Sequence, residues 1–270
     1  MKLKQLPTLI QPSPAPYHGD RAFFCPNALM EARHLTAEDH LVWKVLFDRQ
    51  TALLHRRAAA PFIKGLQQLG LTREAAPSLE ELDQRLHRLT GWNIVPAPGR
   101  IDDRTFLGLL AERKMPVTRW IRPMRHFDYL SGPDLFHDAF GHLPLLTDPH
   151  WAAWMEHFGH MARHHLADAQ AVEQLVRLFW HTAEFGLVRE GEHLRVYGAG
   201  LLSSAAELHH CLSDDAVHTP FAMEATLEAS IIRDGFQASY FVLPSWEHLS
   251  DATAELAVRL AVVPWPAVAQ

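Results

Sequence analysis

Two histidines stand five residues apart in an apolar stretch of this chain, at His137 and His142. A second apolar stretch, residues 179–186, carries a lone acid at Glu184. Two imidazoles and one carboxylate, brought together by folding, would make a three-ligand metal site with open positions on the metal. That pattern suits non-haem Fe(II) and O2 chemistry. The sequence therefore indicates an enzyme.

The spacing of the two histidines does not fit one face of a regular helix. On an ideal α-helix, five residues separate two side chains by about 140°. Gly141 and Pro144 could end the helix here, and a helix that unwinds at its end lets His142 turn back toward His137. Two satisfied core histidines are the competing interpretation. The acids in the same apolar segments weigh against it, since a buried carboxylate without a partner is costly.

Glu184 and the histidines allow other interpretations as well. Glu184 could form a structural salt bridge with Arg177 or Arg195, and the residues alone leave this alternative open. Zinc proteases of the H-E-x-x-H type need an i, i+4 pair, which this motif lacks. A zinc-dependent hydrolase built on His137 and Asp138 is a further alternative, although the apolar neighbours make a poor lining for phosphate.

Composition and charge narrow the class of protein. The chain has 270 residues, of which 48% are hydrophobic, so it can bury a sizeable core. Its net charge of −6 gives no reason to expect a nucleic-acid partner. Two cysteines, Cys25 and Cys211, indicate no disulfide framework. With no run of about 20 apolar residues and no signal-peptide pattern, we expect a cytoplasmic protein without a membrane partner.

Periodicity and capping residues predict a mainly α-helical (α+β) fold. Residues 1–35 are Pro-rich and should form an extended N-terminal arm, followed by a single catalytic domain over 36–270. Thr36, Ser78 and Asp148 are the expected N-caps. Helices are expected at residues 39–57, 79–91, 103–113, 149–166, 168–184, 221–233 and 246–262, and strands at 93–95, 117–121, 187–189, 193–197 and 238–243. In the first helix, the inner stripe is expected at Leu41, Val42, Val45, Leu46 and Leu53. Without a G-x-G-x-x-G or Walker A pattern, we expect no nucleotide cofactor.

Three separated segments resemble one known family. Residues 128–149 (which include Pro133-Asp134-Leu135-Phe136-His137-Asp138), 180–186 and 197–204 resemble the pterin-dependent aromatic amino acid hydroxylases. The closest likeness is to the bacterial phenylalanine 4-monooxygenases. The similarity runs from about residue 36 to about residue 250, with the motifs in the same order.

The resemblance implies an iron site in a central cleft, with His137, His142 and Glu184 as ligands. Fe(II), O2 and a tetrahydropterin (tetrahydrobiopterin or a bacterial equivalent) would react there to hydroxylate L-phenylalanine to L-tyrosine. Ser203 would orient one imidazole ligand, a contact that sets the tautomer and basicity of the ring.

The resemblance also implies a substrate pocket. Arg122 would grip the amino-acid carboxylate with its planar fork, and Asp134 would hold this arginine in place. The substrate ring would lie among Pro133, Trp180, Phe185 and the face of His137.

The pterin is expected near Gly99–Ile101, where it would stack on Phe106 with Asp138 and Phe179 close by. The chain departs from the family pattern here: Arg100 replaces an apolar residue of animal members, Asp138 a longer glutamate, and Phe179 a frequent tyrosine. These departures concern the pterin contacts and leave the iron ligands intact.

Trp180 bears on the choice of substrate. A large ring at this position narrows the pocket and disfavours an indole by overpacking, which favours phenylalanine. Tryptophan as substrate, or a meta-hydroxylated product, is the alternative, since a small tilt of the ring would decide it. The remaining alternative is a catalytically silent relative that only binds iron or pterin. Such a relative would be expected to lack one of the iron ligands, and all three are present.

The length leaves no room for a regulatory domain or a tetramerising coiled coil, so we expect a monomer.

Overall fold

The computed structural model describes residues 34–128 and 132–260. The predicted arm over residues 1–35 falls almost wholly outside this range, as do Tyr129 and Leu130 of the first family motif. The division into an arm and a domain over 36–270 therefore stays a prediction.

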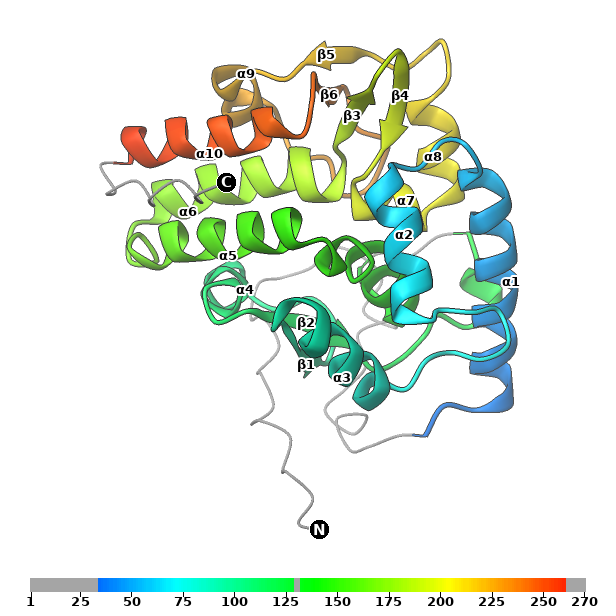
Figure 1. Cartoon of the computed structure of the whole chain (residues 1–270). Helices are drawn as coiled ribbons and strands as arrows, with labels where there is room; N and C mark the ends of the chain where they lie inside the picture. Colours follow the sequence, from blue (N-terminus) through cyan, green and yellow to red (C-terminus); the bar gives the residue numbers. More distant parts are fainter. Residues whose placement is uncertain (1–33, 129–131, 261–270) are drawn as a thin grey trace, which may run out of the picture.

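Helices make up most of the described chain (Figure 1). They are α1 (Ala37–Leu54), α2 (Ala60–Leu69), α3 (Leu79–Thr90), α4 (Asp103–Leu110), α5 (Pro149–Arg163), α6 (Ala169–Phe179), α7 (Ala199–Ser203), α8 (Ala205–Cys211), α9 (Met223–Glu228) and α10 (Glu247–Arg259). Short helical segments are η3 (Met124–His126), η4 (His137–His142), η5 (Leu145–Thr147) and η6 (Trp180–Glu184). The prediction of a mainly α, single-domain fold is confirmed.

Side-chain caps begin the helices where the sequence predicts them. Thr36 accepts from the backbone N–H of Asp39, whose side chain in turn accepts from the backbone of Thr36. Ser78 caps α3, and Asp148 caps α5 ahead of Pro149. Each cap satisfies backbone N–H groups that have no partner inside the helix.

The inner stripe predicted for α1 is only partly right. Val42 and Leu46 are fully buried, but Leu41 and Val45 are 52% and 37% exposed. Trp43, which the prediction left out, is fully buried instead. The face of α1 that meets the core is therefore rotated toward the tryptophan, which contributes more apolar area than either aliphatic residue.

The strands form two small sheets. β1 (Asn93–Ala97) and β2 (Lys114–Thr118) pair in parallel, joined by α4. The second sheet has the order β4-β3-β6-β5, built from β3 (Leu187–Glu190), β4 (His193–Val196), β5 (His218–Pro220) and β6 (Tyr240–Leu243). The predicted hairpin is β3 and β4, turning at Gly191, whose φ of 61° suits a residue without a Cβ.

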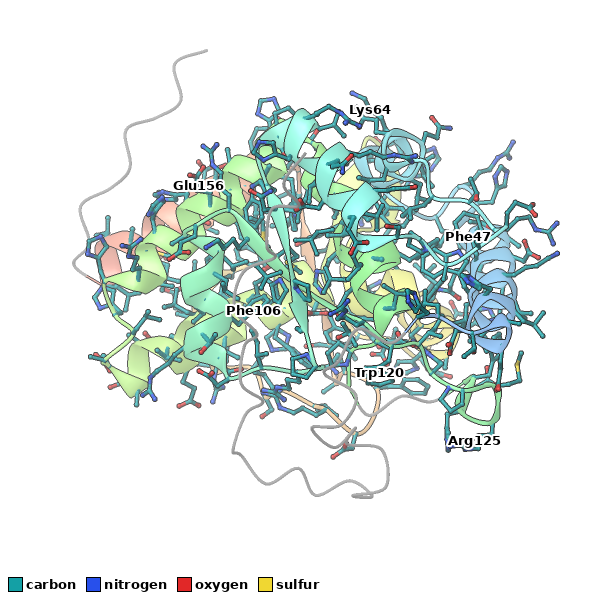
Figure 2. All side chains as sticks on the ribbon, turned by 90° about the horizontal axis from the view of Figure 1, so that it is seen from below. Phe47, Lys64, Phe106, Trp120, Arg125 and Glu156 are labelled. Carbon is teal, nitrogen blue, oxygen red and sulfur yellow. The ribbon has the colours of Figure 1, made fainter. Side chains whose placement is uncertain are left out.

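The core surrounds the segment that carries the two histidines. Phe136 and Phe140 stack with ring centroids 4.6 Å apart, and Trp43 meets Phe136 edge-on at 5.3 Å. In Figure 1, α5 and α6 run side by side through the molecule, with α10 over them. Figure 2 shows Phe106 and Trp120 toward the middle of the lower face, with Arg125 nearer its edge. Among the described residues, no helix is long and apolar enough to cross a membrane.

Candidate active site

The two histidines lie on a π-helix, η4. The backbone N–H of Leu143 donates to the carbonyl of Asp138, five residues earlier, at 3.3 Å. Because i to i+5 bonding widens the turn, residues five apart return to one face. The rings of His137 and His142 lie 5.0 Å apart (centroid to centroid) and meet at 84°. The expectation that the helix unwinds at Gly141 is therefore wrong: the helix continues and widens.

Close backbone approaches bring the other parts of the site to η4. A Cβ on Gly141 would lie 2.9 Å from the carbonyl oxygen of Ala199 in α7, and one on Gly198 would lie 2.4 Å from that of Glu184. Real side chains do not tolerate such distances, so these positions require glycine. The glycines thus allow α7 to pack directly against both the histidine helix and η6.

Glu184 ends a second π-helix, η6, in which Phe185 N–H donates to the carbonyl of Trp180 at 2.9 Å. Its two carboxylate oxygens face the two rings: Oε2 lies 3.6 Å from Nε2 of His137, and Oε1 lies 3.1 Å from Nε2 of His142. Two imidazoles and one carboxylate therefore converge on a single point from two helices.

The alternative salt bridges of Glu184 are absent from the described residues. Arg177 pairs with Glu173 at 2.6 Å, and Arg195 lies 3.8 Å from Glu190. Neither arginine supplies the charge that Glu184 faces.

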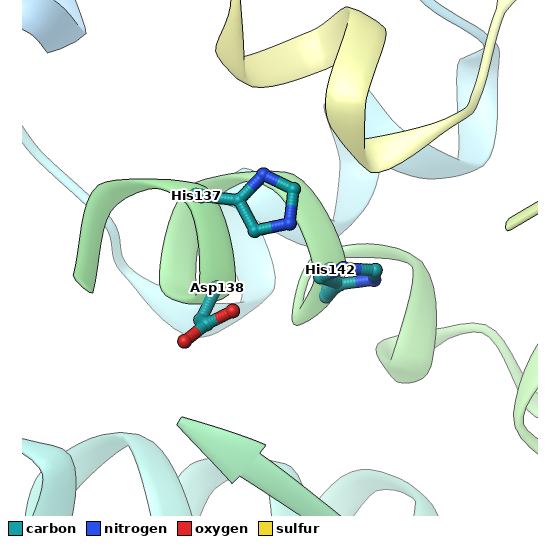
Figure 3. A group of neighbouring side chains, drawn as sticks. All are labelled: His137, Asp138 and His142. Atoms are coloured by element: carbon teal, nitrogen blue, oxygen red, sulfur yellow. The ribbon is translucent and has the colours of Figure 1, made fainter. Parts of the chain in front are cut away.

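Asp138 is a second acid near the histidines. Ligand atoms of His137, Asp138 and His142 lie within 4.8 Å of one another. In Figure 3 the Asp138 carboxylate points to another side of the helix than the His137 ring. One of its oxygens accepts from the backbone N–H of Thr118 at 2.7 Å, and burial raises its pKa to about 7. Glu184, whose carboxylate oxygens lie 3.6 and 3.1 Å from the two rings, is the other candidate for a third ligand.

Ser203 fixes the tautomer of His137. Its Oγ lies 2.9 Å from Nδ1 of the ring, and its hydroxyl donates to the carbonyl of Ala199 at 2.8 Å. Because that bond uses the only hydroxyl proton, Nδ1 must be the donor to Oγ. Nε2 of His137 then carries a lone pair directed at Glu184.

The charges in this cluster are strongly coupled. Burial lowers the pKa of His137 to about 4, so this ring is neutral at pH 7. Burial opposes ionisation of Glu184, but His142 and His137 outweigh it and hold the Glu184 pKa at about 2. A neutral ring lone pair facing a carboxylate, with no proton between them, leaves a position that a cation would satisfy.

A cavity of about 560 Å3 opens onto the cluster. The predicted site residues that line it are Gly99, Ile101, Phe106, Arg122, Pro133, His137, Asp138, His142, Phe179, Trp180, Glu184, Phe185 and Ser203. Asp134 is fully buried behind this wall. The structure thus brings the predicted residues together around one space, as an active-site pocket requires.

Arg122 and Asp134 form a two-pronged buried pair. Nε of Arg122 lies 2.8 Å from Oδ2 of Asp134, and Nη2 lies 3.0 Å from Oδ1. Asp134 also accepts from the backbone N–H of His137 at 2.9 Å. Burial disfavours the Asp134 carboxylate, but Arg122 outweighs it and holds its pKa below the usual range. The pair leaves the outer edge of the guanidinium for another anion.

The predicted pterin wall is also assembled. Phe106 and Phe179 meet edge-to-face with centroids 4.9 Å apart. Gly99 has a φ of 143°, and the neighbouring carbonyl of Pro98 accepts from the indole N–H of Trp120 at 2.9 Å. The loop is therefore held to the segment that leads to Arg122.

The sequence interpretation did not single out Glu207, Arg233 and Gln237, three polar residues that also line the cavity. Two of them lie beyond α9, which ends at Glu228 where a helix was predicted to continue to 233. The following loop lines the cavity instead. Glu207, an acid between apolar positions of α8, was the one visible signal.

Comparison with known proteins identifies the class. A family profile described as biopterin-dependent aromatic amino acid hydroxylase matches residues 27–262. The chain belongs to this family and is an aromatic amino acid hydroxylase. The resemblance noted in the sequence is confirmed.

Individual relatives agree with that assignment. The chain is 42% identical over 231 residues to the phenylalanine-4-hydroxylase of Ralstonia nicotianae, which covers 84% of this chain and 74% of the relative. The phenylalanine hydroxylase of Chromobacterium violaceum, solved with iron(III) and 7,8-dihydrobiopterin, superposes with a TM-score of 0.78 at 39% identity, over 90% of this chain and 88% of that one. The same enzyme bound to cobalt gives a TM-score of 0.78 at 41% identity, over 85% of each chain.

Proposed function

We propose that this chain is an Fe(II)- and tetrahydropterin-dependent monooxygenase that converts L-phenylalanine to L-tyrosine with O2. The observation that carries the proposal is the convergence of His137, His142 and Glu184 at a cavity whose wall carries Arg122 and Trp180. The relatives named phenylalanine-4-hydroxylase support the choice of substrate.

The donor set fits iron. Nε2 of His137 is unprotonated because the ring proton is on Nδ1, which donates to Ser203, and Nε2 faces an ionised carboxylate. Two neutral imidazoles and a carboxylate are the ligands expected of a non-haem Fe(II) site with open positions. When bound, Fe(II) and the tetrahydropterin would supply the activation of O2.

The chain itself would bind and orient the amino acid. Arg122, held from behind by Asp134, offers its free edge to the substrate carboxylate. Trp180 and Phe185, with ring centroids 4.8 Å apart, form an apolar wall with Pro133 for the substrate ring. This arrangement fixes both ends of the substrate and keeps water from the reacting ring.

The pterin would lie on the opposite wall, against Phe106 and the loop at Gly99–Ile101. Phe179 backs Phe106 and also stacks near His142, with centroids 6.3 Å apart. Asp138, fixed by Thr118, would face the pterin from the side of β2.

An aerobic assay tests the proposal. Purified protein is supplied with Fe(II), a tetrahydropterin and phenylalanine, tyrosine or tryptophan in turn, and products are identified by chromatography and mass. Tyrosine from phenylalanine, only when Fe(II) and the pterin are both present, is the expected result. If the main product is hydroxytryptophan or meta-tyrosine, the assignment of substrate or ring position is wrong. If no amino acid gives a product, the proposal is refuted.

Two variants complete the assay. His142→Ala should abolish activity and leave the far-UV circular dichroism unchanged, whereas His150→Ala, on the exposed start of α5, should stay active. We further infer a monomer with residues 36–270 as its catalytic domain, which light scattering and limited proteolysis would test.

A further inference from the structure

The indole of Trp180 is held at its edge by a side chain outside the metal cluster. Nε1 of Trp180 donates to Oε1 of Gln237 at 2.9 Å. The guanidinium of Arg233 lies over the indole, 4.9 Å from its centroid. The plane of this ring is therefore fixed by a directional bond at one edge and a contact on one face.

Gln237 cannot turn its amide to release the indole. Its Nε2 donates to the carbonyl of Ile232 at 2.6 Å, so the amide oxygen must face Trp180. The backbone N–H of Ile232 also approaches that oxygen, at 3.4 Å. Gln237 is 3% exposed, and each polar atom of its side chain has a partner.

Glu207 anchors Gln237 from α8. Its Oε1 accepts from the backbone N–H of Gln237 at 3.1 Å and from the hydroxyl of the fully buried Tyr240 at 2.7 Å. The chain of bonds thus runs from β6 through α8 to the cavity wall. Such buried, fully paired networks are rigid.

We propose that Gln237 is a positioning residue that fixes the plane of Trp180 and so sets which aromatic amino acid is accepted and which ring carbon is hydroxylated. The inference rests on the proposed function, in which the substrate ring lies against Trp180. Trp180 and Glu184 share η6, so a rotation of the indole changes the tilt of the substrate ring relative to the metal ligands.

The test is a double-mutant cycle. Gln237→Met keeps the length of the side chain and removes the acceptor of the indole N–H. Trp180→Phe keeps an aromatic ring and removes the donor. All proteins are assayed with Fe(II), tetrahydropterin and each aromatic amino acid for relative kcat/KM, for the ratio of para- to meta-tyrosine, and for pterin consumed per product.

Gln237→Met should change the phenylalanine-to-tryptophan preference or the product ratio by about 5- to 10-fold, the equivalent of one hydrogen bond. In the Trp180→Phe background, the same change should have less than about a twofold effect, because the bond is already gone. Equal effects in both backgrounds, or no effect in either, would overturn the proposal.

A matched control separates positioning from stability. Trp154 donates from its indole N–H to Oγ1 of the buried Thr253 at 2.5 Å, away from the cavity. Thr253→Val removes that acceptor and should lower stability while preserving preference and product ratio. A shift as large as that of Gln237→Met would assign both effects to lost stability and overturn the proposal.

Gln237→Leu supplies a second arm if Gln237→Met does not fold. It also removes the acceptor of the indole N–H, so the preference or the product ratio should again change by about 5- to 10-fold; a change of less than about twofold would overturn the proposal. Wild-type protein that hydroxylates none of the amino acids would overturn the proposed function, and this inference with it. An active wild type with unchanged ratios in Gln237→Met overturns this inference alone.

Discussion

Ser203 Oγ lies 2.9 Å from Nδ1 of His137 and acts there as the acceptor, because its own proton goes to the carbonyl of Ala199. The contact therefore does more than hold the ring in place. It directs the lone pair of Nε2 toward Glu184 and excludes the tautomer that would block a metal.

Ser203→Ala should weaken metal binding and leave the fold intact. Loss of such an outer partner lowers metal affinity by roughly 10- to 100-fold. Calorimetric titration with Fe(II) under nitrogen measures the effect. Ser213→Ala, which removes a half-buried hydroxyl bonded to the carbonyl of His210, is the control and should bind metal like wild type. Wild-type affinity in Ser203→Ala would mean that another contact sets the tautomer.

Replacing each of the two acids near the histidines by its amide should show which of them binds the metal. Glu184→Gln should reduce metal affinity by more than the roughly 10- to 100-fold expected for an outer partner. Asp138→Asn should change it only a few-fold, because that carboxylate is bonded to the backbone N–H of Thr118 and points to another side of the helix than the His137 ring. The same titration decides between them, and the reverse order of affinities would make Asp138 the ligand.

Removing one partner of the buried pair of Arg122 and Asp134 should lower the free energy of unfolding more than replacing both partners by apolar residues. Asp134→Leu alone leaves a buried guanidinium uncompensated and should lower the free energy of unfolding by about 3–5 kcal/mol. The double variant with Arg122→Met should recover much of this loss in urea unfolding, yet bind phenylalanine poorly. As a control, Arg73→Met removes an exposed pair with Asp48 and should change the free energy of unfolding little. A double variant no more stable than Asp134→Leu would contradict the argument.

The same pair predicts how stability depends on pH. The pKa of Asp134 lies below its unfolded value of about 3.9. Its contribution to the free energy of unfolding is therefore complete above that unfolded value and is lost as pH falls through the folded pKa. Urea unfolding from pH 6 downward should show a steeper loss for wild type than for the Arg122→Met, Asp134→Leu protein. Parallel pH profiles would assign the acid sensitivity to other carboxylates.

Local signals predicted the starts of helices, and the resemblance to a known family predicted residues that line one cavity. Thr36 and Asp148 are caps because a side-chain oxygen just before a helical pattern can accept from the unpaired backbone N–H groups of the first turn. The two π-helices were not predictable in this way. Their extra residue per turn is stabilised by packing of η4 and η6 against α7, which for η4 involves residues some 60 positions apart, and no local propensity encodes it.

The loop after α9 was missed for a related reason. Its helical prediction extended to residue 233, but the chain leaves the helix at Ala229. The backbone N–H of Gln237 then donates to Glu207, 30 positions earlier in the sequence. A buried pair of this kind exists only in the folded chain, so single residues gave little warning of it.

Metal binding should weaken as pH falls. Burial disfavours the charged ring of His142, but Glu184 outweighs burial and raises the His142 pKa above its usual value of about 6.5. Below that raised pKa the metal-free protein carries a proton at His142 that a metal must displace. Apparent Fe(II) affinity should rise with pH through that pKa, and calorimetry in buffers of different ionisation enthalpy should detect proton release. His137, neutral above about pH 4, contributes nothing to this dependence. Affinity that stays constant from pH 6 to 8, without proton release, would show that His142 is already neutral or is no ligand.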